Sequence, residues 1–479
     1  MYRTKLKFQG KGHFVYLPSR NLTLATNLRF WAGFFKSIWS KYKLRALFIL
    51  SVLLAVIFLI KTLVPNLPVF EDNLTVGVIG EYTESNLPQP LSRLYSAGLT
   101  KIEKDGQIVA DLAQNWTTVD GKRFVFNLKD NLLWQDNKKL TVADLQFLSP
   151  NVQVNVVNDQ TLEFILADTF SPFPQTLAKP VFRKDSQVGT GPYKIGNLVK
   201  NGQTSRQITL IPKDRKLPQV TIRFFPNSTT ATMAFKTGQI SVLFNLMRLN
   251  GLENWKGVDI IQSLDSDRLV AVFYNTKDEL LSNAKVRHAL DLSIDRSKFK
   301  NPTAGPYPPT SWVYLETKSV FDTEKAAKLV AEEKVTGAKI KILTPAIFES
   351  LAQDVAYNWK KIGLEVELEK IDKIPDNFQV AIFGLEVPAD PDQYIFWHST
   401  QSQTLTKIED PKLDKLLEDG RKQLTMEERK ETYQQLQKEL KQLVPASFLF
   451  AADRYIVINR NSQNKLDKIR KYLPDFPTD

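Results

Sequence analysis

The sequence predicts an α/β protein of two lobes with mixed sheets, preceded by one N-terminal transmembrane helix. The chain has 479 residues, more than one ordinary domain, and its 43% hydrophobic and 24% charged residues are typical of globular proteins. Strand-like and helix-like patterns alternate along it, and residues 340–368 follow the order strand, helix, strand, which favours parallel strands. An uncharged, largely apolar run at residues 46–60 precedes all of these patterns.

The apolar run predicts a membrane anchor over residues 46–64. Together with residues 61–64, whose lysine can extend toward the lipid headgroups, the run reaches about the 20 residues that a spanning helix needs. The alternative is a cleaved signal peptide. No small-x-small cleavage site follows, however, and 45 preceding residues are long for the basic region of a signal peptide. We therefore expect an uncleaved anchor.

The positive charge of the chain belongs mainly to the segment before this anchor. Eleven of the 64 Lys and Arg residues lie within residues 1–61, where no acid occurs, so 53 basic residues face all 52 acidic ones in the remainder. Basic flanks stay in the cytoplasm, which predicts a cytoplasmic tail at residues 1–45 and an extracytoplasmic body after a proline-containing linker at residues 65–72. The nearly neutral body argues against binding to nucleic acid.

The first half of the body shows strand patterns. Residues 74–79 form an apolar run, and in residues 123–128 the apolar Phe124, Phe126 and Leu128 alternate with other residues, as in a half-buried antiparallel strand. Residues 189–195 begin Gly-Thr-Gly-Pro, but the Gly-Lys-Ser/Thr ending of a phosphate-binding loop is missing. We interpret this segment as a turn that leads into a strand.

The middle of the chain combines a buried strand with an amphipathic helix. Residues 269–276 are mostly apolar and aromatic, and residues 284–296 repeat apolar side chains at three- and four-residue spacing. Further on, Gly363 ends a predicted helix, Asp410 and Pro411 begin another, and Thr425 with Glu428 forms a capping box for a third.

These segments resemble the solute-binding proteins of peptide/nickel-type ABC importers, family 5, also called cluster C. The resemblance covers about residues 73–460. The matching motifs lie at residues 94–100, 109–117, 121–130, 133–145, 189–195, 220–225, 229–235, 237–242, 269–296, 305–312 and 445–450. The resemblance implies a periplasmic-binding-protein-like fold of type II. Lobe I would comprise residues 73–268, with residues 446–479 returning to it, and lobe II residues 269–445.

The resemblance also implies a ligand-binding region around Asp390. In peptide binders of the family, an aspartate three residues before the Asp-Pro pair holds the free ammonium group of the peptide. In this chain Val387 occupies that position, and Glu386 could substitute only with a local shift. Trp312 and Trp397 are further candidates because aromatic rings stack on ligands, although core packing is an equal alternative for both. The matched segments add three more candidate ligand-binding residues, which are Tyr95, Ser96 and Tyr274.

Most catalytic and metal chemistry is excluded by composition. The chain has no cysteine, and its three histidines, His13, His288 and His398, are far apart in sequence. Nucleophile-elbow, HExxH and Walker motifs are absent. We expect no cofactor, no metal and no enzymatic activity, although a hydrolase with two carboxylates remains an alternative.

The expected function is that of a membrane-anchored extracytoplasmic solute-binding protein. It would be a monomer that captures a peptide or other small solute by closing its two lobes and delivers it to the permease of an ABC importer. A surface receptor or a chaperone-like peptide holder with the same fold is the first alternative. The sequence does not identify the ligand.

Overall fold

The computed structural model describes residues 51–52, 73–146, 152–402 and 404–473. The predicted cytoplasmic tail and linker lie outside the described residues, as does all of the predicted anchor except Ser51 and Val52. Within the described ranges, no helix combines the length and apolar character that crossing a membrane requires.

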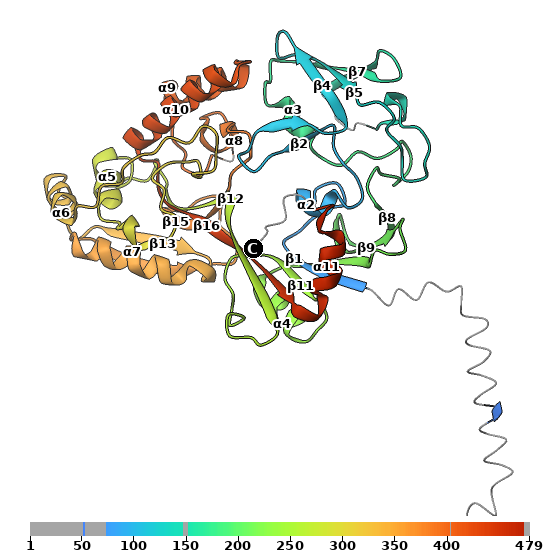
Figure 1. The fold of residues 1–479 in the computed structure, drawn as a ribbon. Helices are drawn as coiled ribbons and strands as arrows, with labels where there is room; N and C mark the ends of the chain where they lie inside the picture. Colours follow the sequence, from blue (N-terminus) through green and yellow to red (C-terminus); the bar gives the residue numbers. More distant parts are fainter. Residues whose placement is uncertain (1–50, 53–72, 147–151, 403, 474–479) are drawn as a thin grey trace, which may run out of the picture. The chain divides into compact units, whose positions relative to one another are not determined.

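A mixed sheet of ten strands runs through the body (Figure 1). Its strand order is β14-β13-β15-β12-β16-β11-β1-β10-β9-β8. β1 pairs in parallel with β10 and β11, and β13 pairs in parallel with β14 and β15, whereas the other pairs are antiparallel. The strands are β1 (Asn73–Ile79), β8 (Tyr193–Asn201), β9 (Thr204–Pro212), β10 (Gln219–Phe225), β11 (Val242–Leu246), β12 (Val258–Tyr274), β13 (Lys339–Thr344), β14 (Glu365–Lys370), β15 (Val380–Glu386) and β16 (Ala446–Asn459).

Two long strands, β12 and β16, connect the halves of this sheet. They pair with each other along most of their length, while β11 extends the sheet from β16 on one side and β15 extends it from β12 on the other. The register between them shifts between Leu264 and Leu269. The predicted strand at residues 269–276 therefore corresponds to the second part of β12. The predicted lobe boundary lies next to this irregularity, and such irregularities disrupt the ladder and bend a strand locally.

Helices cover both faces of the second half of the sheet. Alternate residues of β12 point to opposite faces, so Val270 and Val272 pack in the core under α5, α6 and α7, while Ala271 and Phe273 pack under α8, α9 and α10. Figure 1 shows α9 and α10 on the opposite side of β13 and β15 from α7. These helices are α5 (Ala284–Leu292), α6 (Thr323–Glu332), α7 (Glu349–Lys361), α8 (Tyr394–Trp397), α9 (Pro411–Lys422) and α10 (Met426–Leu443), with 3-10 turns η2 (Arg296–Lys298) and η3 (Ala346–Phe348).

The first half of the sheet has a core on each face as well. Val76 and Val78 of β1 pack with residues of α2 (Gln89–Ser92) and α11 (Gln463–Arg470), and the other face packs against α4 (Ser228–Lys236). β16 contributes Ile456 to the first core and Val457 to the second. The C-terminal strand is thus part of both halves of the sheet.

A smaller sheet with its own core projects from the first half. Its order is β4-β5-β7-β6, and the alternating burial of β5 confirms the predicted strand at residues 123–128. A hairpin and a short helix border it. The elements are β2 (Thr100–Ile102), β3 (Ile108–Ala110), β4 (Ala113–Thr118), β5 (Arg123–Leu128), β6 (Val152–Val156), β7 (Thr161–Leu166), α3 (Phe173–Thr176) and the turn η1 (Val142–Asp144), and η4 (Arg460–Ser462) precedes α11.

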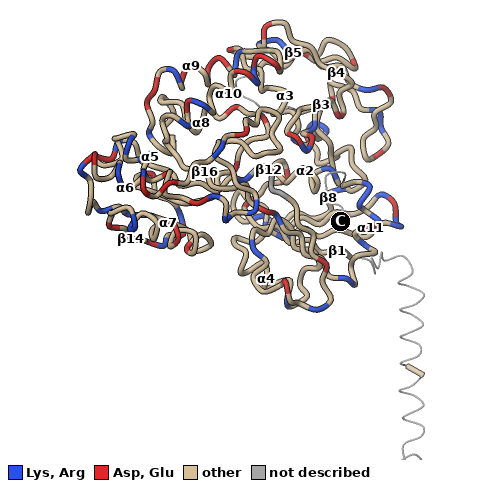
Figure 2. Tube along the Cα trace, turned by 60° about the vertical axis from the view of Figure 1, so that its left-hand side comes forward, with Lys and Arg blue, Asp and Glu red and all other residues tan. Residues whose placement is uncertain are grey.

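Several local predictions are confirmed. The side chain of Asp410 accepts a hydrogen bond from the amide of Leu413 at the start of α9, and Thr425 accepts one from the amide of Glu428 at the start of α10. Gly363 has a φ of +97° just after α7, a conformation that side-chain-bearing residues rarely adopt. Figure 2 shows Lys and Arg interspersed with Asp and Glu along the described trace, in agreement with a nearly neutral body.

Candidate binding site between the lobes

The segment around α3 in the first half of the chain touches the end of α9 and the Asp390 loop in the second half. The amide of Ser171 donates to the carbonyl of Arg421 over 2.8 Å, and the amide of Asp390 donates to Oε1 of Gln175 over 2.8 Å. The guanidinium of Arg421 also lies 5.0 Å from the centre of the Phe170 ring. The first contact joins two main-chain groups, and the other two use the side chains of Gln175, Arg421 and Phe170. Together they link the two lobes in this conformation.

A cavity of about 180 Å³ lies beside these contacts and has walls from both lobes. Trp116 of β4 and Trp312 of the second lobe contribute aromatic walls, and Asp390 and Arg429 contribute charge. Such a mixture of aromatic surface and a few fixed polar groups is typical of sites for small organic ligands. The lining residues are Gly106, Gln107, Ile108, Trp116, Thr118, Phe124, Ser171, Pro172, Pro174, Gln175, Trp312, Asp390, Leu424, Met426 and Arg429.

Two ion pairs hold the lobe II side of the cavity in place. Arg429 donates two hydrogen bonds to the carboxylate of Asp390, over 2.8 and 2.5 Å, and the side chains of both residues are less than a tenth exposed. Nε of Arg421 donates to Asp392 over 2.9 Å. Burial raises the pKa of Asp392, Arg421 opposes that rise, and the charge of Asp390 adds to it. Burial alone would lower the pKa of Arg429, but the charge and hydrogen bonds of Asp390 raise it above its ordinary value.

A second polar group of side chains gathers near the carboxyl ends of β1, β11 and β15. Arg268 donates a hydrogen bond to Glu386 over 2.6 Å. Burial and the charge of Glu386 raise the pKa of Tyr82, whereas Arg268, Asn245 and Arg454 act to lower this pKa. Oδ1 of Asn245 is buried without a hydrogen-bond partner among the described residues, and Asn245 has a φ of +65°. In sheets with parallel strands, ligands bind outside the carboxyl ends of the strands. This group could therefore present polar atoms to a ligand.

Of the residues predicted from sequence, Trp312 and Asp390 are brought together at the cavity. Glu386 forms the ion pair with Arg268, and its side chain is 73% exposed. Val387 packs in the core beneath α8, α9 and α10. An ammonium group therefore meets no carboxylate at position 387, and Glu386 already has a cationic partner.

The other four predicted residues are buried, and their polar atoms have partners within the protein. The Tyr95 hydroxyl donates to the carbonyl of Glu84, and Ser96 donates to the carbonyl of Val181. The Tyr274 hydroxyl shares a hydrogen bond of 2.7 Å with Ser447, and the Trp397 indole donates to Gln393 over 2.7 Å. In this conformation all four have packing roles, and none lines the inter-lobe cavity.

Sequence reasoning did not identify Trp116, Arg429, Tyr82, Asn245 or Arg268. Trp116 lies in a matched motif and could have been chosen, as Trp312 was, because aromatic rings stack on ligands. Nothing in the local sequence distinguishes Arg429 or Asn245 from ordinary residues of a helix or of a strand end. Across the part of the chain that the structure describes, no group of three or more His, Cys, Asp and Glu side chains is arranged to hold a metal ion.

Known proteins resemble this chain in sequence and in fold. The family model of the bacterial extracellular solute-binding proteins, family 5, matches residues 107–405. The oligopeptide-binding protein AppA of Bacillus subtilis is 22% identical over 482 residues, covering 81% of this chain and 88% of that protein.

Two solved structures have the same fold. NikZ from Campylobacter jejuni, in complex with Ni(L-His), superimposes with a TM-score of 0.67 at 22% identity and covers 81% of this chain and 94% of that one. AppA from Bacillus subtilis, in complex with a nonapeptide, superimposes with a TM-score of 0.64 at 20% identity and covers 83% of this chain and 98% of that one. At these identities the likeness concerns the two-lobed fold alone.

Proposed function

Because this chain belongs to the bacterial extracellular solute-binding proteins of family 5, we propose that it captures a peptide or other small solute between its lobes and delivers it to an ABC importer. Members of this family bind solutes without performing chemistry on them, in agreement with the prediction that the chain is not an enzyme. AppA is named as an oligopeptide-binding protein, and NikZ was solved in complex with Ni(L-His). The identity of the solute in this protein is part of the proposal.

One observation carries the proposal. Ser171 and Gln175 of the first lobe hydrogen-bond to Arg421 and Asp390 of the second, beside a cavity to which both lobes contribute walls. A site assembled from two lobes binds its ligand fully only when the lobes meet, which is the basis of capture by hinge closure. Trp312 and Asp390 remain our candidates for the ligand-binding surface, and Trp116 joins them.

Hinge closure predicts that a bound ligand brings the lobes closer together. Because the chain has no cysteine, cysteines placed at the exposed positions Lys129 and Lys438 can be labelled selectively with a donor and an acceptor dye. Energy transfer should rise when a solute identified by mass spectrometry of the purified protein is added. A control pair at Lys328 and Lys438, both in the second lobe, should show no change. Demonstrated binding with unchanged transfer in the first pair would contradict closure.

We further propose that residues 46–64 anchor a monomeric body to the outer face of the cytoplasmic membrane. The support is the apolar run, the basic segment before it and the missing cleavage site. Protease added outside spheroplasts should degrade the body and leave a protected fragment of about the first sixty residues, which carries the span. Recovery of processed protein in the medium would overturn the proposal.

The ligand should lack a free α-ammonium group. A buried charge needs a partner, Val387 cannot provide one, and Glu386 is paired with Arg268. Leaving such a charge unpaired typically costs about 3–5 kcal/mol, roughly a few hundred- to several thousand-fold in affinity. In calorimetric titrations, N-acetylated peptides should bind more tightly than the same peptides with free N-termini. The reverse order would indicate that Glu386 leaves Arg268 to hold the ammonium group.

A further inference from the structure

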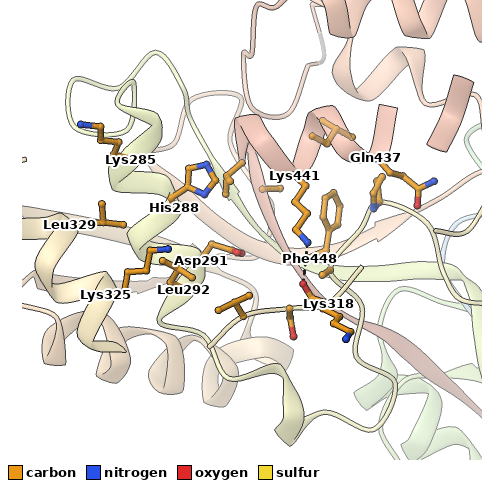
Figure 3. Close-up of a pocket in the computed structure, with 17 residues that line it drawn as sticks. Lys285, His288, Asp291, Leu292, Lys318, Lys325, Leu329, Gln437, Lys441 and Phe448 are labelled. Atoms are coloured by element: carbon orange, nitrogen blue, oxygen red, sulfur yellow. Dashed lines mark hydrogen bonds between the residues drawn. The ribbon is translucent and has the colours of Figure 1, made fainter. Parts of the chain in front are cut away.

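A second cavity, of about 340 Å³, lies within the second lobe and shares no lining residue with the inter-lobe cavity (Figure 3). Its walls come from α5, the segment before α6, α6 itself, the last turns of α10 and the start of β16. The lining residues are Lys285, His288, Asp291, Leu292, Ala304, Pro306, Lys318, Ser319, Val320, Lys325, Leu329, Gln437, Leu440, Lys441, Val444, Ala446 and Phe448. The volume is within the range of small-molecule sites, about 300–1,000 Å³.

The floor of this cavity is apolar. Leu440, Val444 and Phe448 are at most 5% exposed, and Leu292 and Leu329 add aliphatic surface from α5 and α6. The polar atoms of Gln437 are already engaged, because its Nε2 donates to the carbonyl of Val313 and its Oε1 accepts from the amide of Leu315. The floor therefore favours an apolar group over an ion or a fully polar solute.

The rim of the cavity is cationic. Lys318, Lys325 and Lys441 are exposed, and none of their ammonium groups lies within 4 Å of a carboxylate among the described residues. Lys441 instead donates to the carbonyl of Lys318 over 3.1 Å, as the dashed line in Figure 3 marks. The fourth lysine, Lys285, pairs with Glu333 over 2.8 Å and projects away from the cavity in Figure 3.

The remaining groups do not neutralise the rim. Asp291 is the acid that lines the cavity, and it forms an ion pair with the buried guanidinium of Arg296. Nε2 of His288 lies 2.9 Å from the carbonyl of Gln442, so this nitrogen carries the proton. Three lysines from separate segments thus border an apolar floor, and Asp291, the acid that lines the cavity, is already paired with Arg296.

From this arrangement we infer that the cavity is a second ligand site, which binds an organic anion. The ligand would place a compact apolar body on the floor formed by Leu440, Val444 and Phe448 and direct its carboxylate or phosphate group to the lysine rim. A neutral ligand would leave the ammonium groups unmatched, and an inorganic anion would leave the floor uncovered. The inference does not depend on transport by the inter-lobe site.

The test uses the full chain in nanodiscs of neutral lipid and four small probes. Benzoate and phenyl phosphate combine a ring with an anionic group, benzyl alcohol keeps the ring without the charge, and inorganic phosphate keeps the charge without the ring. In calorimetric titrations the two ring anions should bind about tenfold or more tightly than either control. Benzyl alcohol lacks the charged hydrogen bond, and inorganic phosphate lacks the ring that would be buried on the apolar floor. Equal binding of benzyl alcohol or of inorganic phosphate would overturn the inference.

Substitutions locate the binding. Lys325→Gln and Lys441→Gln should each weaken benzoate binding by about tenfold, whereas Lys328→Gln, on α6 but outside the cavity, should leave it unchanged. Trp312→Ala, which alters the inter-lobe cavity, should also have no effect. Binding that responds to Trp312→Ala and not to the two lysine variants would assign the anion to the inter-lobe site and overturn the inference.

A final arm separates two sources of the same anionic chemistry. If nanodiscs with phosphatidylglycerol bind benzoate as tightly as neutral ones, the natural ligand is a free solute. If the anionic lipid competes with benzoate and the competition disappears in Lys441→Gln, the ligand is a lipid headgroup. Either result supports an anion site at this cavity.

Discussion

Replacing Arg429 by methionine is expected to lower the free energy of unfolding by about 3–5 kcal/mol. Arg429 neutralises the buried carboxylate of Asp390 through two hydrogen bonds, and its Nε also donates to the carbonyl of Gly420 over 3.0 Å. Methionine fills a similar volume but leaves the Asp390 charge without a partner. Urea unfolding of the variant and of the unmodified protein under the same conditions measures the difference.

Two further variants test whether the loss comes from the unpaired charge. Lys415→Met breaks an exposed pair with Asp419 on α9 and should cost less than about 1 kcal/mol. Adding Asp390→Leu to Arg429→Met removes the stranded charge, and the double variant should regain most of the lost stability. A single variant no less stable than Lys415→Met would show that the pair does not stabilise this region.

Replacing Arg287 by methionine should cost at least about 3 kcal/mol, because several buried carbonyls lose their donors at about 1–3 kcal/mol each. Arg287 is 3% exposed and donates to the carbonyls of Leu281, Ser282, Leu443 and Val444. The last two belong to the end of α10, so one side chain joins α5 to the C-terminus of that helix. Burial lowers the pKa of Arg287, yet a guanidinium remains charged at neutral pH.

The neighbouring histidine provides the matched control for Arg287. Within the described part of the chain, the ring of His288 has one hydrogen-bond partner, the carbonyl of Gln442 at 2.9 Å, and the residue is less buried than Arg287. His288→Ala should therefore cost about 1 kcal/mol, the typical net contribution of one hydrogen bond. The loss of stability in Arg287→Lys should lie between those of Arg287→Met and His288→Ala, because one ammonium group cannot reach all the carbonyls that the guanidinium bridges. If Arg287→Met and His288→Ala unfold at the same urea concentration, the arginine does not join the two helices.

The candidate site shows how far residue patterns alone can lead. The motif predicted a binding role for Asp390 but not its partner Arg429, because the two residues are 39 positions apart and meet only where the Asp390 loop packs on α10. The sequence also could not decide between a ligand-binding role and core packing for the two tryptophans, because that choice depends on which distant segments surround each ring. Trp312 lies at the inter-lobe cavity, whereas Trp397 is buried under α9 and α10, and nothing in the two local sequences distinguishes these environments.

The sequence by itself determined the local elements. The alternation in β5, the side-chain caps of α9 and α10 and the glycine after α7 depend on neighbours within a few residues, so the chain carries their cause in its own order. Only the tertiary structure decided the ten-strand order, in which β12 pairs with the distant β16 and sets Gln262 opposite Tyr455. It also decided the cationic rim of the second-lobe cavity. These features depend on distant segments meeting in space, and the energy of each contact exists only once both segments are packed.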